Sequence, residues 1–230
     1  MNNTLDLFKE RTDEIDFIFS VMQDIEEDNI TTSDNSQLIR ILKSNFLLML
    51  YNLVEACVVS GMLEIYEELK NNEYTYDELI DAVQRIWSDH CIDEVYKSAS
   101  SKAAYENKVA EIIAQIITNK PIFLSKSALS ISGNLDAKRI KELCDKYQIR
   151  YSAKDKNGSL KFVKEKRQQL AHGEDSFGNC ARDITLSQLK ETRDAVVEFM
   201  NGILQGMTNY YNEKGYLKDP TAKKKRKKRG

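Results

Sequence analysis

The 230-residue chain is long enough to bury a substantial core in one domain, or in one domain with an insertion. Seven of its 34 basic residues form an unbroken run from Lys223 to Arg229, so the remainder carries 27 basic against 36 acidic residues, a formal charge of −9. In such an acidic body no broad RNA-binding surface is evident, so we expect any RNA site to be a local basic cleft.

Apolar residues recur with a helical period along almost the whole chain, which predicts an all-α fold. A first helix carries Ile15 to Ile25 and ends at a polar turn between Asn29 and Ser36. A second helix, with Ser33 or Asp34 as its N-cap, runs towards Leu69. Two further helices are marked by two apolar sets, Leu79, Ile80, Val83, Ile86 and Trp87 for the third and Val109, Ile112, Ile113, Ile116 and Ile117 for the fourth.

The second half of the chain continues in the same way. Between Pro121 and Ser132 the pattern alternates more, which leaves room for one short strand or hairpin. We expect one helix over Asn134–Tyr147 and another over about Leu160–Ala171. Thr185 and Gln188 resemble a capping box at the start of a final helix of about 25 residues.

These elements predict a helical bundle with long paired helices, forming a single domain over residues 1–215. Residues 71–129 separate the paired helices from the last part of the bundle, and we interpret them as a helical insertion or elaboration. Residues 216–230 form a basic tail whose composition predicts disorder. The tail either attracts RNA phosphates by counterion release or is only a solubilising segment.

The cysteines indicate a reducing compartment. They are scattered without a CxxC or other ligand spacing, at Cys57, Cys91, Cys144 and Cys180. We therefore expect a cytoplasmic protein with reduced thiols, without a cofactor and without a metal site.

No signal peptide is expected, because Met1 to Glu10 is polar and acidic. The apolar stretch from Phe46 to Leu63 is interrupted by Asn52, Glu55 and Ser60, which indicates a buried helix and not a membrane span.

Arg167 and His172 lie five positions apart near the end of the helix expected over Leu160–Ala171, and Gly173 follows as a helix stop. A neutral imidazole can take the proton from a ribose 2′-hydroxyl, and a guanidinium can hold the phosphate whose charge grows in the transition state. On an ideal helix the two side chains are roughly 140° apart, so one chain need not aim both at the same phosphate. A two-fold dimer could do so. The alternative is a solvated helix end, where charged residues usually lie.

The run Arg-Gln-Gln-Leu-Ala-His-Gly at residues 167–173 resembles the Arg-x4–6-His motif of the HEPN superfamily (higher eukaryote and prokaryote nucleotide-binding domains). Residues 52–56, 132–140 and 173–177, with Arg182-Asp183 and a long final helix after them, are similar to one prokaryotic HEPN branch found in toxin–antitoxin and phage-defence loci. The resemblance extends over about residues 38–215. Gln168 departs from the pattern, because Asn, Asp or His often follows the arginine in that family, but glutamine can still hydrogen-bond.

The resemblance implies a dimeric, all-helical, metal-independent endoribonuclease. Arg167 and His172 would be its catalytic residues, with Gln168 beside them. Its implied partners are RNA, a second copy of the chain, and an antitoxin or partner defence protein. Basic side chains for an RNA cleft lie directly beside the motif, at Lys161, Lys164 and Lys166.

Asn52 and Glu55 lie three positions apart on an otherwise apolar helix, so both can point along one side. A buried carboxylate is costly without a partner, which predicts an ion pair between Glu55 and Arg167 or a nearby lysine. Such a pair is either structural or orients the catalytic arginine. The triplet Asp89-His90-Cys91 contains metal-ligand residue types, but adjacent helical residues point in different directions and no fourth ligand is evident.

Two other classes of function stay open. One is a catalytically inactive HEPN protein that binds RNA or a partner nuclease, as an antitoxin or a scaffold, which Gln168 and the acidic body favour. The other is a nucleotide-binding module whose histidine-containing cleft does not cut RNA. Nucleotide hydrolysis and esterase chemistry are disfavoured, because the sequence has neither a Walker-type loop nor a Gly-x-Ser-x-Gly elbow.

Overall fold

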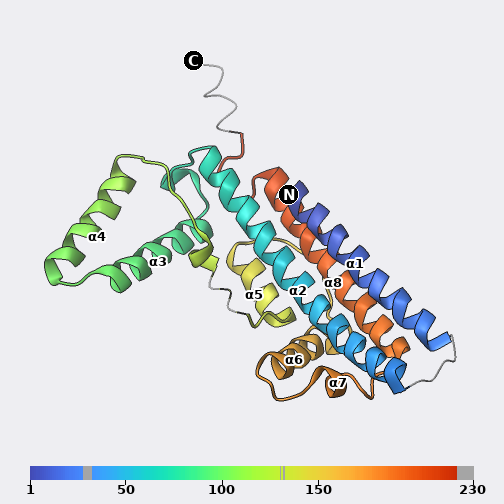
Figure 1. The fold of residues 1–230 in the computed structure, drawn as a ribbon. Helices are drawn as coiled ribbons and strands as arrows, with labels where there is room; N and C mark the ends of the chain where they lie inside the picture. The colour runs from blue at the N-terminus through green and yellow to red at the C-terminus, as the bar shows by residue number, and fades with distance from the viewer. Residues whose placement is uncertain (28–32, 130, 132, 222–230) are drawn as a thin grey trace.

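The computed structural model describes residues 1–27, 33–129, 131 and 133–221 (Figure 1). Its α-helices are α1 (Asn2–Glu27), α2 (Ser33–Asn71), α3 (Asp81–Ser98), α4 (Lys102–Ile117), α5 (Ala137–Lys146), α6 (Ser159–Ala171), α7 (Phe177–Cys180) and α8 (Leu186–Glu213). Short 3₁₀ turns occur at η1 (Tyr76–Glu78), η2 (Lys126–Leu129) and η3 (Lys156–Gly158). No sheet is present within the described residues, and the all-α prediction is confirmed.

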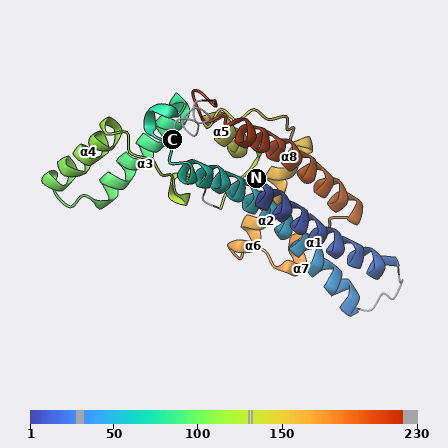
Figure 2. The same cartoon turned by 90° about the horizontal axis from the view of Figure 1, so that it is seen from above.

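Three long helices, α1, α2 and α8, lie side by side and form the body of the protein (Figures 1 and 2). The central helix α2 contacts α1, α6, α7 and α8. It is long and apolar enough to cross a membrane by length and composition alone, but 56% of its most apolar window is buried inside the protein. The apolar residues of α2 therefore form the centre of the bundle core.

The start of α8 and its close packing against the chain after α5 follow from particular residues of its sequence. Thr185 Oγ1 accepts from the Gln188 N–H at 3.2 Å, and Gln188 Oε1 accepts from the Thr185 N–H at 2.9 Å, so the predicted capping box is confirmed. Two glycines in α8 let the chain after α5 cross the helix closely. A Cβ on Gly206 would lie 2.3 Å from the carbonyl oxygen of Arg150, so a larger residue cannot occupy this position without a backbone shift.

Several boundaries differ from the sequence-based expectations. The polar turn expected from Asn29 to Ser36 falls partly outside the described residues, and its described part, residues 33–36, is already helical. The helix expected over Asn134–Tyr147 begins only at Ala137, because Asp136 Oδ1 caps it by accepting from the Arg139 N–H at 3.0 Å. Leu79 and Ile80 precede α3.

The strand allowed between Pro121 and Ser132 does not form in the described part of that segment, which contains η2. Pro121 makes only an isolated bridge to Thr75, since proline has no N–H with which to continue a ladder.

The tail begins later than the sequence predicted. Tyr216 and Leu217, which were expected in the tail, are buried, and Tyr216 packs on Tyr74 with ring centroids 5.8 Å apart. The basic run itself lies outside the described residues.

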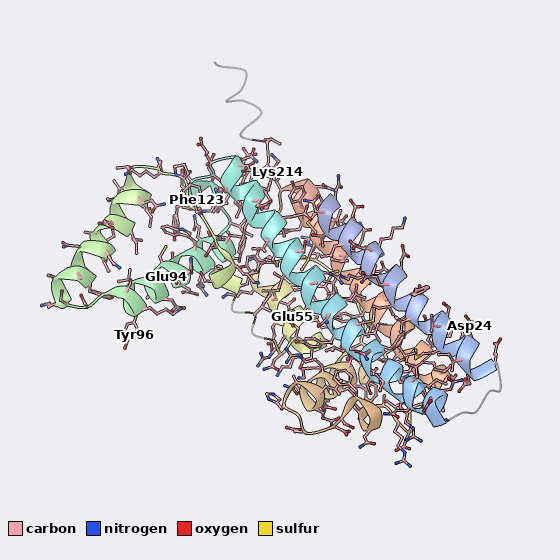
Figure 3. The ribbon with its side chains drawn as sticks, viewed as in Figure 1. Asp24, Glu55, Glu94, Tyr96, Phe123 and Lys214 are labelled. Carbon is pink, nitrogen blue, oxygen red and sulfur yellow. The ribbon has the colours of Figure 1, made fainter. Side chains whose placement is uncertain are left out.

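Helices α3 and α4 project from the bundle as an arm (Figures 1 and 2). They pack mainly against each other, and α4 has no buried residue. The arm falls within residues 71–129, but whether it is an insertion in a smaller bundle stays a prediction. Large exposed apolar side chains are concentrated on the arm and the segment after it, at Ile92, Tyr96, Tyr105, Ile113, Ile117 and Phe123, of which Figure 3 labels Tyr96 and Phe123.

Candidate functional site

Arg167 on α6 is held in place by an aromatic ring of α2. Its Cζ atom lies over the ring of Tyr51, 5.0 Å from the ring centroid. Gly133 approaches the same guanidinium, since a Cβ there would lie 3.4 Å from Arg167 Nη2, and its φ of +48° also favours glycine. The stacking and the close backbone approach fix the plane of the guanidinium.

Tyr51 is itself rigidly held. Its side chain is 1% exposed, and its hydroxyl accepts from the Leu135 N–H at 3.2 Å. Burial raises the pKa of Tyr51 to about 12; the Leu135 N–H opposes this shift, and the carboxylate of Glu55 adds to it. The ring is therefore a neutral phenol at physiological pH. Sequence reasoning missed Tyr51, although its position four residues before Glu55 places both on one side of α2.

A second set of contacts joins α6 to the segment before α5. The side-chain amide of Gln168 donates to Asn134 Oδ1 at 2.7 Å. Lys164 Nζ pairs with Asp136 Oδ2 at 2.5 Å, and both side chains are mostly buried. Burial opposes ionisation of this carboxyl group, but Lys164 and the Arg139 N–H together lower the pKa of Asp136 below its ordinary value. The segment that contacts Arg167 is thus fixed to the same helix by the residue after Arg167 and by a residue one turn before it.

Arg167 lines an open groove of about 790 Å³ beside α2. The predicted pair Asn52 and Glu55 lies in the same groove, with Asn52 exposed and Glu55 half-buried. Figure 3 shows Glu55 midway along α2. No direct ion pair between Glu55 and Arg167 occurs in the described structure, and Tyr51 interacts with both. The structure therefore links Glu55 to Arg167 through Tyr51.

His172 is the C-cap of α6, where its N–H donates to the Gln168 carbonyl oxygen at 2.9 Å. Gly173 follows with φ +69°, which ends the helix at the predicted point. The imidazole is exposed, makes no hydrogen bond or ion pair with the described residues, and does not line the groove. Arg167 therefore lines this groove and His172 does not.

The segment after His172 is attached to α2 by two side chains that sequence reasoning did not single out. Lys43 Nζ donates to the Ile184 carbonyl oxygen at 2.7 Å, and Ser44 Oγ donates to the Phe177 carbonyl oxygen at 2.6 Å. Both side chains are buried. The first bond holds the segment after α7 against α2, and the second holds the start of α7 there, so the chain that follows His172 is attached to α2 at two points. The sequence signal for these two contacts was the polar pair Lys43-Ser44, which lies beside the apolar run of α2.

The three lysines expected to bind RNA are differently placed. Lys161 makes only an exposed pair with Glu165 at 3.8 Å, which costs little to open. Lys166 Nζ donates to Gln169 Oε1 at 3.2 Å. Lys164 would have to leave Asp136 before it contacted a phosphate. None of the three lines the groove beside Arg167.

Within residues that the structure describes, no group of three or more His, Cys, Asp or Glu side chains could hold a metal ion. His90 and Cys91 line a separate hollow of about 340 Å³ between α3 and α4. All four cysteines are free thiols. Burial raises the pKa of Cys57 to about 12, so this thiol is not a nucleophile at neutral pH.

The fold and the site together define an all-α bundle with a fixed guanidinium in an open groove and an exposed histidine at the end of the same helix. A family model described as HEPN_MAE_28990-like HEPN matches residues 2–216. The chain therefore belongs to the HEPN_MAE_28990-like family, which confirms the resemblance to HEPN proteins. No curated protein and no solved structure matches the chain. The family match supports a nuclease or an RNA-related module as the class of function.

Proposed function

We propose that the protein is a metal-independent endoribonuclease that acts through Arg167 and His172. The observation that carries the proposal is the state of Arg167, which is fixed on Tyr51, lines an open groove and has no ion pair in the described structure. A guanidinium that is held in place with its N–H donors free can bind a phosphate as its charge increases in the transition state.

His172 supplies the general base in this proposal. Its exposed imidazole takes the proton of a ribose 2′-hydroxyl, and the 2′-oxygen attacks the adjacent phosphorus. The bond from phosphorus to the 5′-oxygen breaks, and the departing oxygen takes up a proton. The products are a 2′,3′-cyclic phosphate and a 5′-hydroxyl, as the resemblance to HEPN nucleases implies.

A second copy of the chain completes the proposed site. Arg167 lies in the groove and His172 does not, and five residues of helix turn the two side chains roughly 140° apart. A two-fold dimer in which the ends of the two α6 helices meet would place the His172 of one copy near the Arg167 of the other. Phe177 on α7 is an exposed large apolar side chain close to this end of α6, which suits a contact between copies.

The proposal is tested with purified wild-type protein and total RNA in an excess of EDTA. We expect cleavage to persist, and the new ends to be a 5′-hydroxyl and a 2′,3′-cyclic phosphate. A substrate with a 2′-deoxyribose before the scissile phosphate should remain intact, because the nucleophile is absent. Cleavage that requires added Mg²⁺, or that leaves 5′-phosphates, would contradict the proposal.

Tyr51→Leu should lower kcat about 2- to 30-fold, because a cation–π contact contributes about 0.5–2 kcal/mol. Tyr51→Phe keeps the ring under Arg167 and should keep most of kcat, although the unpaired Leu135 N–H will cost about 1–3 kcal/mol of folding stability. Steady-state cleavage and thermal unfolding measure the two effects separately. If the Leu and Phe variants had the same kcat, Tyr51 would only fill space in the core.

A catalytically inactive RNA- or partner-binding protein is the second candidate function. It is favoured by Gln168, whose amide is occupied by Asn134, and by the absence of a described partner that orients His172. RNA binding without cleavage in EDTA or Mg²⁺ would support it. For either function we propose a cytoplasmic role in a toxin–antitoxin or phage-defence system, with an antitoxin or defence protein as partner.

A further inference from the structure

We infer that the groove beside Arg167 binds the phosphate backbone of a single RNA strand, and that Arg11 and Lys126 are its additional phosphate contacts. The inference rests on the proposed function, because it takes Arg167 as the contact to the scissile phosphate. It assigns RNA binding to α1 and η2, and not to the lysines of α6.

Three cationic side chains from three different elements line this one groove: Arg11 from α1, Lys126 from η2 and Arg167 from α6. Arg11 is 47% exposed, and its pair with Glu14 at 3.1 Å is equally exposed and costs little to exchange for a phosphate. Lys126 is exposed and has no ion pair with any described residue. Because the cations come from three separate elements, they suit an extended polyanion better than one small anion.

The three carboxylates that line the groove differ in how strongly they would offset the positive charge of these cations. Glu64 is held by the α-amino group of Met1, and it accepts from the Thr4 N–H at 2.7 Å. Burial opposes its ionisation, but these contacts lower the pKa of Glu64, and its charge is balanced by the ammonium group. Glu55 interacts with Tyr51. Neither Glu55 nor Glu67 has an ion pair among the described residues, and Glu67 is the more exposed of the two, so it is the carboxylate whose removal should most favour a bound strand.

The remaining lining indicates how the strand is recognised. Asn3 and Asn52 offer exposed amides that can bond phosphate or sugar oxygens, and Ala56, Val59 and Leu63 form an apolar floor. Among the described residues, no aromatic side chain lines the groove, although aromatic rings are the usual platforms for bases. The groove therefore recognises the backbone with little dependence on base sequence, and single-stranded DNA should bind it as RNA does.

The test measures binding with full-length His172→Ala protein, so that RNA is not cut, and a 5′-labelled single-stranded RNA over a series of salt concentrations. Each phosphate contact on a single strand contributes about 0.7 to the slope of log K against log salt. Arg11→Gln and Lys126→Gln should each reduce the magnitude of the slope by about 0.7, with RNA and with DNA of the same sequence. Arg85→Gln and Lys102→Gln, both exposed on the arm, are the matched controls and should leave the slope unchanged.

A charge change of opposite sign gives a second measurement. Glu67→Gln should tighten RNA binding, whereas Glu106→Gln on α4 should not. Unchanged slopes for Arg11→Gln and Lys126→Gln would overturn the inference, as would equal losses in the arm controls, because bulk charge would then explain the binding. If wild-type protein fails to cut RNA while the slopes fall as expected, the nuclease proposal fails and the binding groove stands.

Discussion

His172→Ala and Arg167→Ala should each reduce RNA cleavage about 10²- to 10⁴-fold, the typical cost of losing a general base or a charged transition-state contact. The imidazole is exposed and the helix ends at the following glycine, so His172→Ala removes no packing on which the fold depends. Cleavage rates in EDTA, with circular dichroism as a check of folding, measure the effect. Wild-type activity in either variant would contradict the assignment.

The chain offers matched controls for both substitutions. His90→Ala changes the only other histidine, which lies at the hollow between α3 and α4, and should leave cleavage unchanged. Arg85→Ala removes an exposed arginine from α3 and should also leave cleavage unchanged. Arg167→Lys keeps the positive charge but loses the planar group that stacks on Tyr51, so it should recover little of the lost rate. Full recovery would mean that charge alone is sufficient.

The helices could be predicted because each carries its own local signal. The apolar period of α2 and the Thr185–Gln188 capping box are properties of neighbouring residues. Short elements that depend on tertiary contacts were not predictable: α7 has one turn and is held by Ser44, which lies more than 130 positions earlier.

The motif that carries the proposed chemistry was visible in the sequence, but its surroundings were not. Glu55 was expected to pair with Arg167 or a nearby lysine, and the structure instead places Tyr51 in interaction with both Glu55 and Arg167, since residue 51 shares a helix face with residue 55. Lys164 was expected to contact RNA and instead pairs with the residue that caps α5. Sequence alone could not show these contacts, because each partner comes from a distant segment with no local pattern of its own.

Mixing Arg167→Ala protein with His172→Ala protein should restore cleavage to about one quarter of the wild-type rate, although each variant alone is inactive. Arg167 lines the groove of its own chain and His172 does not, so the proposed shared site takes its arginine from one copy and its histidine from the other. Random pairing puts half of the molecules in mixed dimers, and each mixed dimer has one intact site of its two.

The recovery depends on the two copies exchanging, so it is measured after the variants have been unfolded and refolded together, with light scattering to show a dimer at micromolar concentration. Refolding His172→Ala with His172→Asn is the matched control and should restore nothing, because no mixed dimer then contains an intact histidine. Mixed dimers that form and stay inactive would place the whole site in one chain. An active monomer would exclude the shared cleft altogether, since Arg167 and His172 would then have to meet through a movement of α6 within a single bundle.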